Sequence, residues 1–261
     1  MPTVEANGEV LFYIREGKGP AAVLVHNLAA NGQVWRGLID ELGDRYEGVA
    51  FDCRCHGQST GNGPFTIENA AEDLKAGLDV LGIESAHMIG LSMGGSICLT
   101  FHSRWPQRVR SLVLADSTAQ VDPALAADRL YAIQEALHYL TMEDFGKQAA
   151  GEILRPSTAR ETRQELARMI ALLDQKSYLE VLKAVLTTDV NPLLGLVSIP
   201  TLVVVGEQDN RTPLSHAQHL ADSIAGAKLE VIPEAGHLSN LDNPEAFNAA
   251  VAGFLDGQPA H

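Results

Sequence analysis

The chain has few cysteines, and their positions argue against a disulfide scaffold. Cys53, Cys55 and Cys98 are an odd number of thiols, and two of them stand one residue apart. This spacing is no disulfide framework. The run Cys53-Arg54-Cys55-His56 contains metal-ligand residue types, but no fourth ligand is apparent. We therefore expect small packed thiols near the functional site rather than a metal centre.

Basic residues are also in short supply: there are 19 against 33 acidic ones, and the formal net charge is −14. This balance disfavours nucleic acid and anionic membrane surfaces as partners. It also gives no long-range attraction to an anionic substrate, so specificity for a carboxylate would need a local arginine. Candidates are Arg129, Arg155, Arg160, Arg163 and Arg168, although solvated helix faces are the commoner place for such charges.

Long apolar runs are missing, and residues 1–5 do not begin a charged-then-apolar signal segment. A membrane-spanning helix needs about 20 apolar residues, and a secretory signal needs that N-terminal pattern. The sequence therefore predicts a cytoplasmic protein that does not enter a membrane. It contains no phosphate-binding loop and no metal-ligand cluster, so we expect no nucleotide, flavin or metal cofactor.

What the sequence does contain is an alternation of strand-like and helical segments. Such alternation is typical of an α/β protein with a mostly parallel, twisted sheet and helices on both faces. The alternation stops between residues 121 and 196, where helical stretches follow one another and Pro123, Pro156 and Pro192 punctuate them. We expect 1–120 and 197–261 to form the core and 121–196 a helical cap inserted into it. The tail after Gly257 is expected to fray.

These elements can be placed approximately along the chain. The expected strands cover residues 10–15, 21–26, 48–52, 86–91, 109–115, 201–205 and 228–232, and the expected core helices cover 35–42, 67–81, 93–105, 214–224 and 244–255. The insertion carries apolar side chains, most of which should pack against the core. They are Leu137, Tyr139, Leu140, Phe145, Met169, Leu172 and Leu173.

The most informative stretch is Gly90-Leu91-Ser92-Met93-Gly94, which follows a strand-like run and precedes a helical pattern. This G-x-S-x-G arrangement between a strand and a helix is typical of a nucleophile elbow. The sharp turn brings backbone segments close together, so a Cβ at position 90 or 94 would clash. The hydroxyl of Ser92 is then raised above the sheet at a helix N-terminus, where free N–H groups favour developing negative charge.

A serine nucleophile needs a base and a carboxylate, and both follow in a workable order. Asp209 comes shortly after the strand-like run 201–205, and His237 comes after the run 228–232. Because the carboxyl ends of parallel strands meet at one edge of a sheet, we expect both side chains to lie near Ser92. Glu207 and Asp116 are the alternative acids.

These motifs resemble those of the α/β-hydrolases over nearly the whole chain, from about residue 9 to 256. His26-Asn27-Leu28 resembles the family's His-Gly oxyanion turn with asparagine in the glycine place, and Asp52–Ser59 resembles its D-x-R-G-H-G-x-S loop with Cys55 replacing a glycine. Within the family, Phe65–Glu68 and Gly236–Asn240 are most similar to 3-oxoadipate enol-lactonases and small esterases.

The resemblance implies a role for each residue. Ser92, His237 and Asp209 would be nucleophile, base and orienting acid, and the backbone N–H groups of Leu28 and Met93 would form the oxyanion hole. Two further residues have two interpretations each. Asn27 would bind substrate or tie down its loop, and Trp35 would line the pocket floor or pack the first helix. Separately, Arg54 would be a buried strut or a substrate contact, and we favour the strut; His26 and His56 would be structural.

The predicted reaction is cleavage of a small carboxylic ester or lactone through an acyl-serine intermediate, without nucleic acid or membrane partners. Homo-oligomerisation is left open. Carbon–carbon hydrolysis of a dienone ring-cleavage product and a cofactor-free lyase or oxygenase are the alternatives on the same scaffold. A haloalkane dehalogenase is disfavoured because its nucleophile is an aspartate, and a non-catalytic scaffold is disfavoured because all three triad residues are present.

Overall fold

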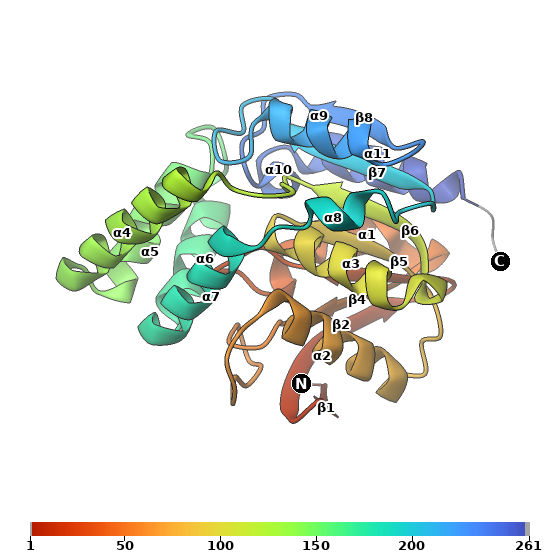
Figure 1. The fold of residues 1–261 in the computed structure, drawn as a ribbon, viewed down its shortest axis with the longest axis horizontal. Coiled ribbons are helices and arrows are strands. Elements are labelled where there is room, and N and C mark those ends of the chain that lie inside the picture. The colour runs from red at the N-terminus through yellow and green to blue at the C-terminus, as the bar shows by residue number, and fades with distance from the viewer. Residues whose placement is uncertain (1, 259–261) are drawn as a thin grey trace.

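The computed structural model describes residues 2–258, and eight strands in it form a single sheet with helices on both faces (Figure 1). The strand order is β1-β2-β4-β3-β5-β6-β7-β8, and the pairs from β4 onward are parallel. The expected mostly parallel sheet is therefore confirmed. The strands are β1 (Thr3–Ala6), β2 (Glu9–Gly17), β3 (Ala21–Val25), β4 (Glu47–Phe51), β5 (Ala86–Leu91), β6 (Val109–Ala115), β7 (Thr201–Gly206) and β8 (Lys228–Ile232).

The first strand was not among the expected ones. It has four residues and pairs antiparallel with β2 at the edge of the sheet, so it offers too short an alternation to stand out in the sequence. The fraying predicted after Gly257 falls mostly on residues 259–261, which lie outside the described residues.

Each face of the sheet has its own apolar core because strand side chains alternate between faces. In β3, Ala22 and Leu24 belong to the core covered by α1 and α11, whereas Val23 and Val25 belong to the core covered by α2, α3 and α9. The helices of the sheet-forming part are α1 (Arg36–Leu42), α2 (Ile67–Val80), α3 (Met93–Arg104), α9 (Leu214–Ser223), α10 (Ser239–Asp242) and α11 (Pro244–Asp256). Short 3₁₀ turns cover Gly32–Trp35, Gly43–Arg45 and Pro106–Arg108.

Between β6 and β7 the chain forms five helices, which lie largely to one side of the sheet (Figure 1). Asp122, Thr141 and Asp174 cap the N-termini of three of them by accepting hydrogen bonds from backbone N–H groups of the first turn. Pro156 separates the second helix from the third. They are α4 (Pro123–Tyr139), α5 (Met142–Ile153), α6 (Arg160–Ala171), α7 (Gln175–Thr187) and α8 (Asn191–Leu194).

Most of the apolar side chains expected to pack in this insertion are buried, including Leu137 and Phe145. Tyr139 and Leu172 are exceptions, with 79% and 76% of their surface exposed. Tyr139 stands two residues after Leu137, which is more than half a helical turn away, so the two cannot share one face. The prediction for these two side chains was wrong. Among the described residues no helix has the length and apolarity to span a bilayer.

Candidate active site

The turn between β5 and α3 holds Ser92 in a strained conformation. Its backbone has φ 53° and ψ −112°, in the left-handed half of φ space that residues other than glycine rarely adopt. A Cβ on Gly90 would lie 2.3 Å from the carbonyl oxygen of Gly94, and one on Gly94 would lie 2.1 Å from that of Val25. Both glycines are therefore required by close backbone approach, as the motif predicts.

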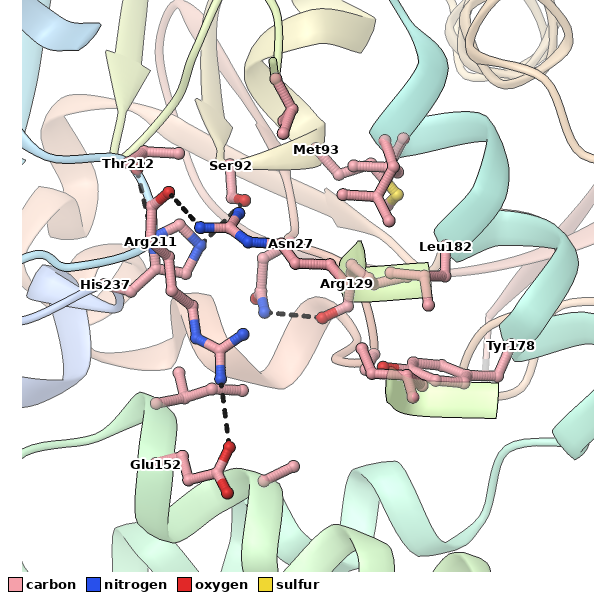
Figure 2. A pocket seen from close by; sticks show the side chains of 18 of the residues that line it. Asn27, Ser92, Met93, Arg129, Glu152, Tyr178, Leu182, Arg211, Thr212 and His237 are labelled. Atoms are coloured by element: carbon pink, nitrogen blue, oxygen red, sulfur yellow. Dashed lines mark hydrogen bonds and ion pairs between the residues drawn. The ribbon is translucent and has the colours of Figure 1, made fainter. Parts of the chain in front are cut away.

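Three predicted residues from separate strand ends meet at this turn (Figure 2). The hydroxyl oxygen of Ser92 lies 3.1 Å from Nε2 of His237, and Nδ1 of His237 lies 2.9 Å from Oδ2 of Asp209. With Nδ1–H donating to the carboxylate, Nε2 is left as an acceptor for the serine proton. The arrangement can therefore carry a proton from Ser92 to His237 while the carboxylate stabilises the resulting charge.

Asp209 is held by more than the histidine. Its Oδ1 accepts hydrogen bonds from the backbone N–H groups of Arg211 and Thr212, and its Oδ2 accepts one from Oγ1 of Thr212 at 2.7 Å. Burial alone would raise the pKa of Asp209, but the hydrogen bonds from His237 and Thr212 and the nearby imidazole outweigh it and lower this pKa. The carboxylate is thus kept ionised beside the imidazole.

Of the alternative acids, Asp116 lies close by but points elsewhere. Its Oδ1 accepts from the N–H of Gly206, and its Oδ2 accepts from the N–H and hydroxyl of Ser239. Complete burial, with Asp209 adding like charge, raises the pKa of Asp116 to about 7. The carboxylate thus joins the end of β7 to the segment that follows His237. Asp209 is the acid that contacts the imidazole.

The predicted oxyanion residues lie beside the serine. Leu28 and Met93 line the same cavity as Ser92. Met93 is the first residue of α3, so its N–H has no acceptor within the helix. Asn27 also lines this cavity, and its Nδ2 donates to the carbonyl oxygen of Leu28 at 2.8 Å. The side chain of Asn27 therefore ties down the loop that carries Leu28.

Trp35 is the predicted substrate contact that the structure does not bring to the cavity. Its side chain is completely buried against the ring of Phe247, at 6.3 Å between ring centroids, on the face covered by α11. The packing interpretation of Trp35 thus replaces the pocket-floor interpretation. The indole is too large and apolar to remain at the start of α1 without such cover.

Arg54 forms the expected buried strut. Its Nε and Nη2 contact the two carboxylate oxygens of Asp73 at 2.5 and 2.6 Å, and Glu9 lies 3.7 Å from Nη1. The rings of His26 and His56 pack edge to face nearby. Burial lowers the pKa of His26 to about 4 and that of His56 to about 3, so both are neutral structural groups.

The cavity above Ser92 measures about 550 Å³ and has two unlike walls. Polar groups surround the triad end, among them Arg129, Arg211, Thr118 and Asn210. The far wall is apolar and comes from helices α4 to α7. It includes Ile133, Phe145, Ile170, Tyr178, Leu182 and Leu186. Thr212 and Arg211 were not singled out in the sequence, although the short run after Asp209 places both next to its carboxylate.

Comparisons with known proteins agree over nearly the whole chain. The sequence model of the alpha/beta hydrolase fold family matches residues 20–244. The protein "3-oxoadipate enol-lactonase 2" of Acinetobacter baylyi is 31% identical over 259 residues, covering 97% of this chain and 96% of that protein. A "putative carbamate hydrolase RutD" of Caulobacter sp. is 29% identical, covering 93% of this chain and 94% of that protein. The solved enol-lactonase of Burkholderia xenovorans has a TM-score of 0.89 at 25% identity, covering 98% of this chain and 100% of that chain. These similarities include the helical insertion.

Proposed function

Because the chain belongs to the alpha/beta hydrolase fold family, we propose that it is a serine hydrolase that cleaves a small carboxylic ester or lactone through an acyl-serine intermediate. The observation that carries the proposal is the relay from Ser92 through His237 to Asp209, with contacts of 3.1 and 2.9 Å at the floor of a cavity. The enol-lactonase among the relatives supports the ester or lactone bond.

In this proposal Ser92 attacks the substrate carbonyl carbon while His237 accepts the hydroxyl proton. The negative oxygen of the tetrahedral intermediate is bound by the N–H groups of Leu28 and Met93, each worth about 10²–10³ in rate. His237 then donates its proton to the leaving oxygen, which departs as an alcohol or enol. Water, activated by His237, hydrolyses the acyl-serine and restores the enzyme.

We also propose that residues 121–196 act as a cap over this site, with 1–120 and 197–261 as the catalytic core. The insertion supplies the far wall of the cavity, so substrate would enter between it and the sheet. Excluding water in this way strengthens the electrostatic interactions at the reacting carbonyl. The proposed partner is a small molecule, and the proposed location is the cytoplasm.

The test is hydrolysis of p-nitrophenyl acetate with and without a serine-directed phosphonate, followed by mass spectrometry of the labelled peptide. We expect turnover, its loss on labelling, and an adduct on Ser92. The Ser92→Ala variant should fold normally and lose turnover by at least about 10⁴-fold. Activity preserved in purified Ser92→Ala protein would reject the assignment.

The same experiment separates the competing chemistries. Labelling of Ser92 without ester turnover would favour the carbon–carbon hydrolase or the lyase and oxygenase alternatives. A carbamate substrate should be included because one group of relatives is named for carbamate hydrolysis. Faster turnover of a carbamate than of its matched ester would move the assignment from ester to carbamate cleavage.

A further inference from the structure

Two arginine side chains line the cavity that contains Ser92. Arg129 comes from α4 and Arg211 from the loop after β7. Figure 2 shows the side chain of Arg129 extending from α4 toward Ser92 and His237, and that of Arg211 extending past His237 toward Glu152. Nη2 of Arg129 donates to the backbone carbonyl oxygen of Arg211 at 3.4 Å, which brings the cation close to the loop that carries Asp209.

The positive charge of this pair is poorly balanced by the protein. Among the described residues that line the cavity, Glu152 is the one carboxylate, and it lies 3.7 Å from Nη2 of Arg211. The Glu152 side chain is 57% exposed, so water weakens this pair. The hydrogen bond that Arg129 donates to Arg211 goes to a backbone carbonyl oxygen rather than to a carboxylate. Burial, with Arg211 as a like charge, lowers the pKa of Arg129 despite the opposing effect of the Asp209 carboxylate, and the arginine remains charged at neutral pH.

The local positive charge of Arg129 and Arg211 is opposite in sign to the net charge of the chain. The chain has a formal net charge of −14, so its overall field repels anions. Partly buried cations with only weak partners are costly unless a ligand compensates them. The guanidinium fork can bind a planar carboxylate through two parallel hydrogen bonds.

The opposite wall of the cavity would bind an apolar group. Phe145 and Tyr178 pack ring against ring at 5.5 Å between centroids, and Leu182 and Leu186 continue this surface along α7. Burial raises the pKa of Tyr178 to about 12, so its phenol stays neutral. A cavity of about 550 Å³ is far larger than an acetyl group requires, so this wall can accommodate a chain of several carbon atoms.

From these contacts we infer that the substrate is an amphipathic anion: an ester or lactone with a carboxylate bound by Arg129 and Arg211 and an apolar chain bound by the insertion. This inference rests on the proposed function, because it assigns the substrate of the same site. It makes Arg129 and Arg211 residues that determine specificity, without a part in proton transfer.

The test measures binding rather than turnover. Hexanoate, hexanamide and acetate are titrated into Ser92→Ala protein in a calorimeter at pH 7.5. We expect hexanoate to bind at least about tenfold more tightly than hexanamide, which has the same chain without the charge, and than acetate, which has the charge without the chain. In the Ser92→Ala background, Arg129→Gln and Arg211→Gln should each weaken hexanoate binding about tenfold and change hexanamide binding less than twofold.

Arg129→Lys retains the charge and should recover part of the hexanoate affinity. Arg168→Gln changes an exposed arginine of the same insertion, outside the cavity, and should leave all three affinities unchanged. Thermal unfolding of each variant shows whether it is folded. Equal binding of hexanoate and hexanamide, or hexanoate binding that survives both glutamine variants, would overturn the role of the arginines. Equal binding of acetate and hexanoate would overturn the role of the apolar wall.

This design separates the inference from the proposed function. Binding to Ser92→Ala protein needs no acyl-enzyme, so selective hexanoate binding can be found even if wild-type protein fails to hydrolyse p-nitrophenyl acetate. In that case the serine hydrolase assignment fails and the anion site stands. If p-nitrophenyl acetate is turned over but hexanoate is not bound selectively, the serine hydrolase assignment stands and the anion site fails.

Discussion

At the scale of single residues, Thr212 is the side chain whose contribution is easiest to isolate. Its hydroxyl donates to Oδ2 of Asp209, the oxygen that also contacts His237. Thr212→Val keeps the shape but removes this donor, so the carboxylate is less firmly oriented and its pKa rises. We expect kcat for p-nitrophenyl acetate to fall about tenfold while KM changes less than twofold.

A matched control for this prediction is Thr187→Val, which changes an exposed threonine on α7 whose hydroxyl contacts only backbone carbonyl groups of its own helix. It should leave both constants unchanged. If Thr212→Val raises KM and leaves kcat intact, Thr212 acts on substrate binding, and the orienting role is wrong.

Single residues also show what sequence patterns reveal and what they leave out. Ser92, Asp209 and His237 could be selected because each follows a strand, and strand ends share an edge. Only one arginine of the pair was predicted: Arg129 was one of five candidates, whereas Arg211 lies outside the insertion that contains them. The direction of a side chain on an inserted helix depends on how that helix packs, which spacing along the chain does not specify. The same limitation explains the errors at Tyr139 and Leu172.

At the scale of elements, the insertion and the histidine loop are joined through one carboxylate. Oδ1 of Asp242, at the end of α10, accepts hydrogen bonds from the N–H of Arg155 at 3.0 Å and from the hydroxyl of Thr158. Its Oδ2 accepts one from the N–H of Gly236 at 2.8 Å, directly before His237. Arg155 and Thr158 lie between α5 and α6, so Asp242 couples the insertion to the loop that carries His237.

Asp242→Asn keeps the size of the side chain but replaces one of the two accepting oxygens with an N–H₂ group. The donors on that side, either those of Arg155 and Thr158 or that of Gly236, then lose their acceptor. We expect the free energy of unfolding to fall by about 1–3 kcal/mol and kcat to fall because His237 is less well placed. Urea unfolding and steady-state kinetics measure the two effects. Asp256→Asn, which alters an exposed partner of Arg45, is the control and should change stability by less than about 1 kcal/mol. Unchanged stability and kcat in Asp242→Asn would mean that the connection does not constrain the loop.

The elements themselves were largely predictable. Every expected core strand and helix is found, because hydrophobic periodicity and punctuating glycines and prolines mark them in the sequence, and the alpha/beta hydrolase fold is confirmed. The edge strand β1 was missed because four residues carry too little pattern. For residues 121–196 only a helical insertion was predicted. Its division into five helices depends on N-caps such as Asp122 and Thr141.

At the scale of the whole molecule, buried histidines should govern stability in mild acid. Burial lowers the pKa of His26 to about 4, of His56 to about 3 and of His87 to about 4, whereas an unfolded chain protonates them near 6.5. Between pH 6.5 and about 4 the unfolded state therefore binds more protons, so stability is present above this window and is lost as the pH falls through it. Asp116 acts in the opposite direction, because its pKa is raised to about 7 and the folded state keeps its proton in this window.

Three protons gained by these histidines and one retained by Asp116 leave an excess of about two protons in the unfolded state, so these four groups together should lower the free energy of unfolding by about 3 kcal/mol per pH unit between pH 6 and 5. Urea unfolding at several pH values measures this slope. His87 lies 2.8 Å from the Ser111 hydroxyl inside the protein, and His87→Gln should reduce the slope by about 1.4 kcal/mol per pH unit. His138→Gln changes an exposed histidine and should leave the slope as it is. Equal slopes in the wild-type and His87→Gln proteins would show that His87 is protonated in the folded state, because only a histidine that stays neutral inside the protein makes unfolding take up a proton.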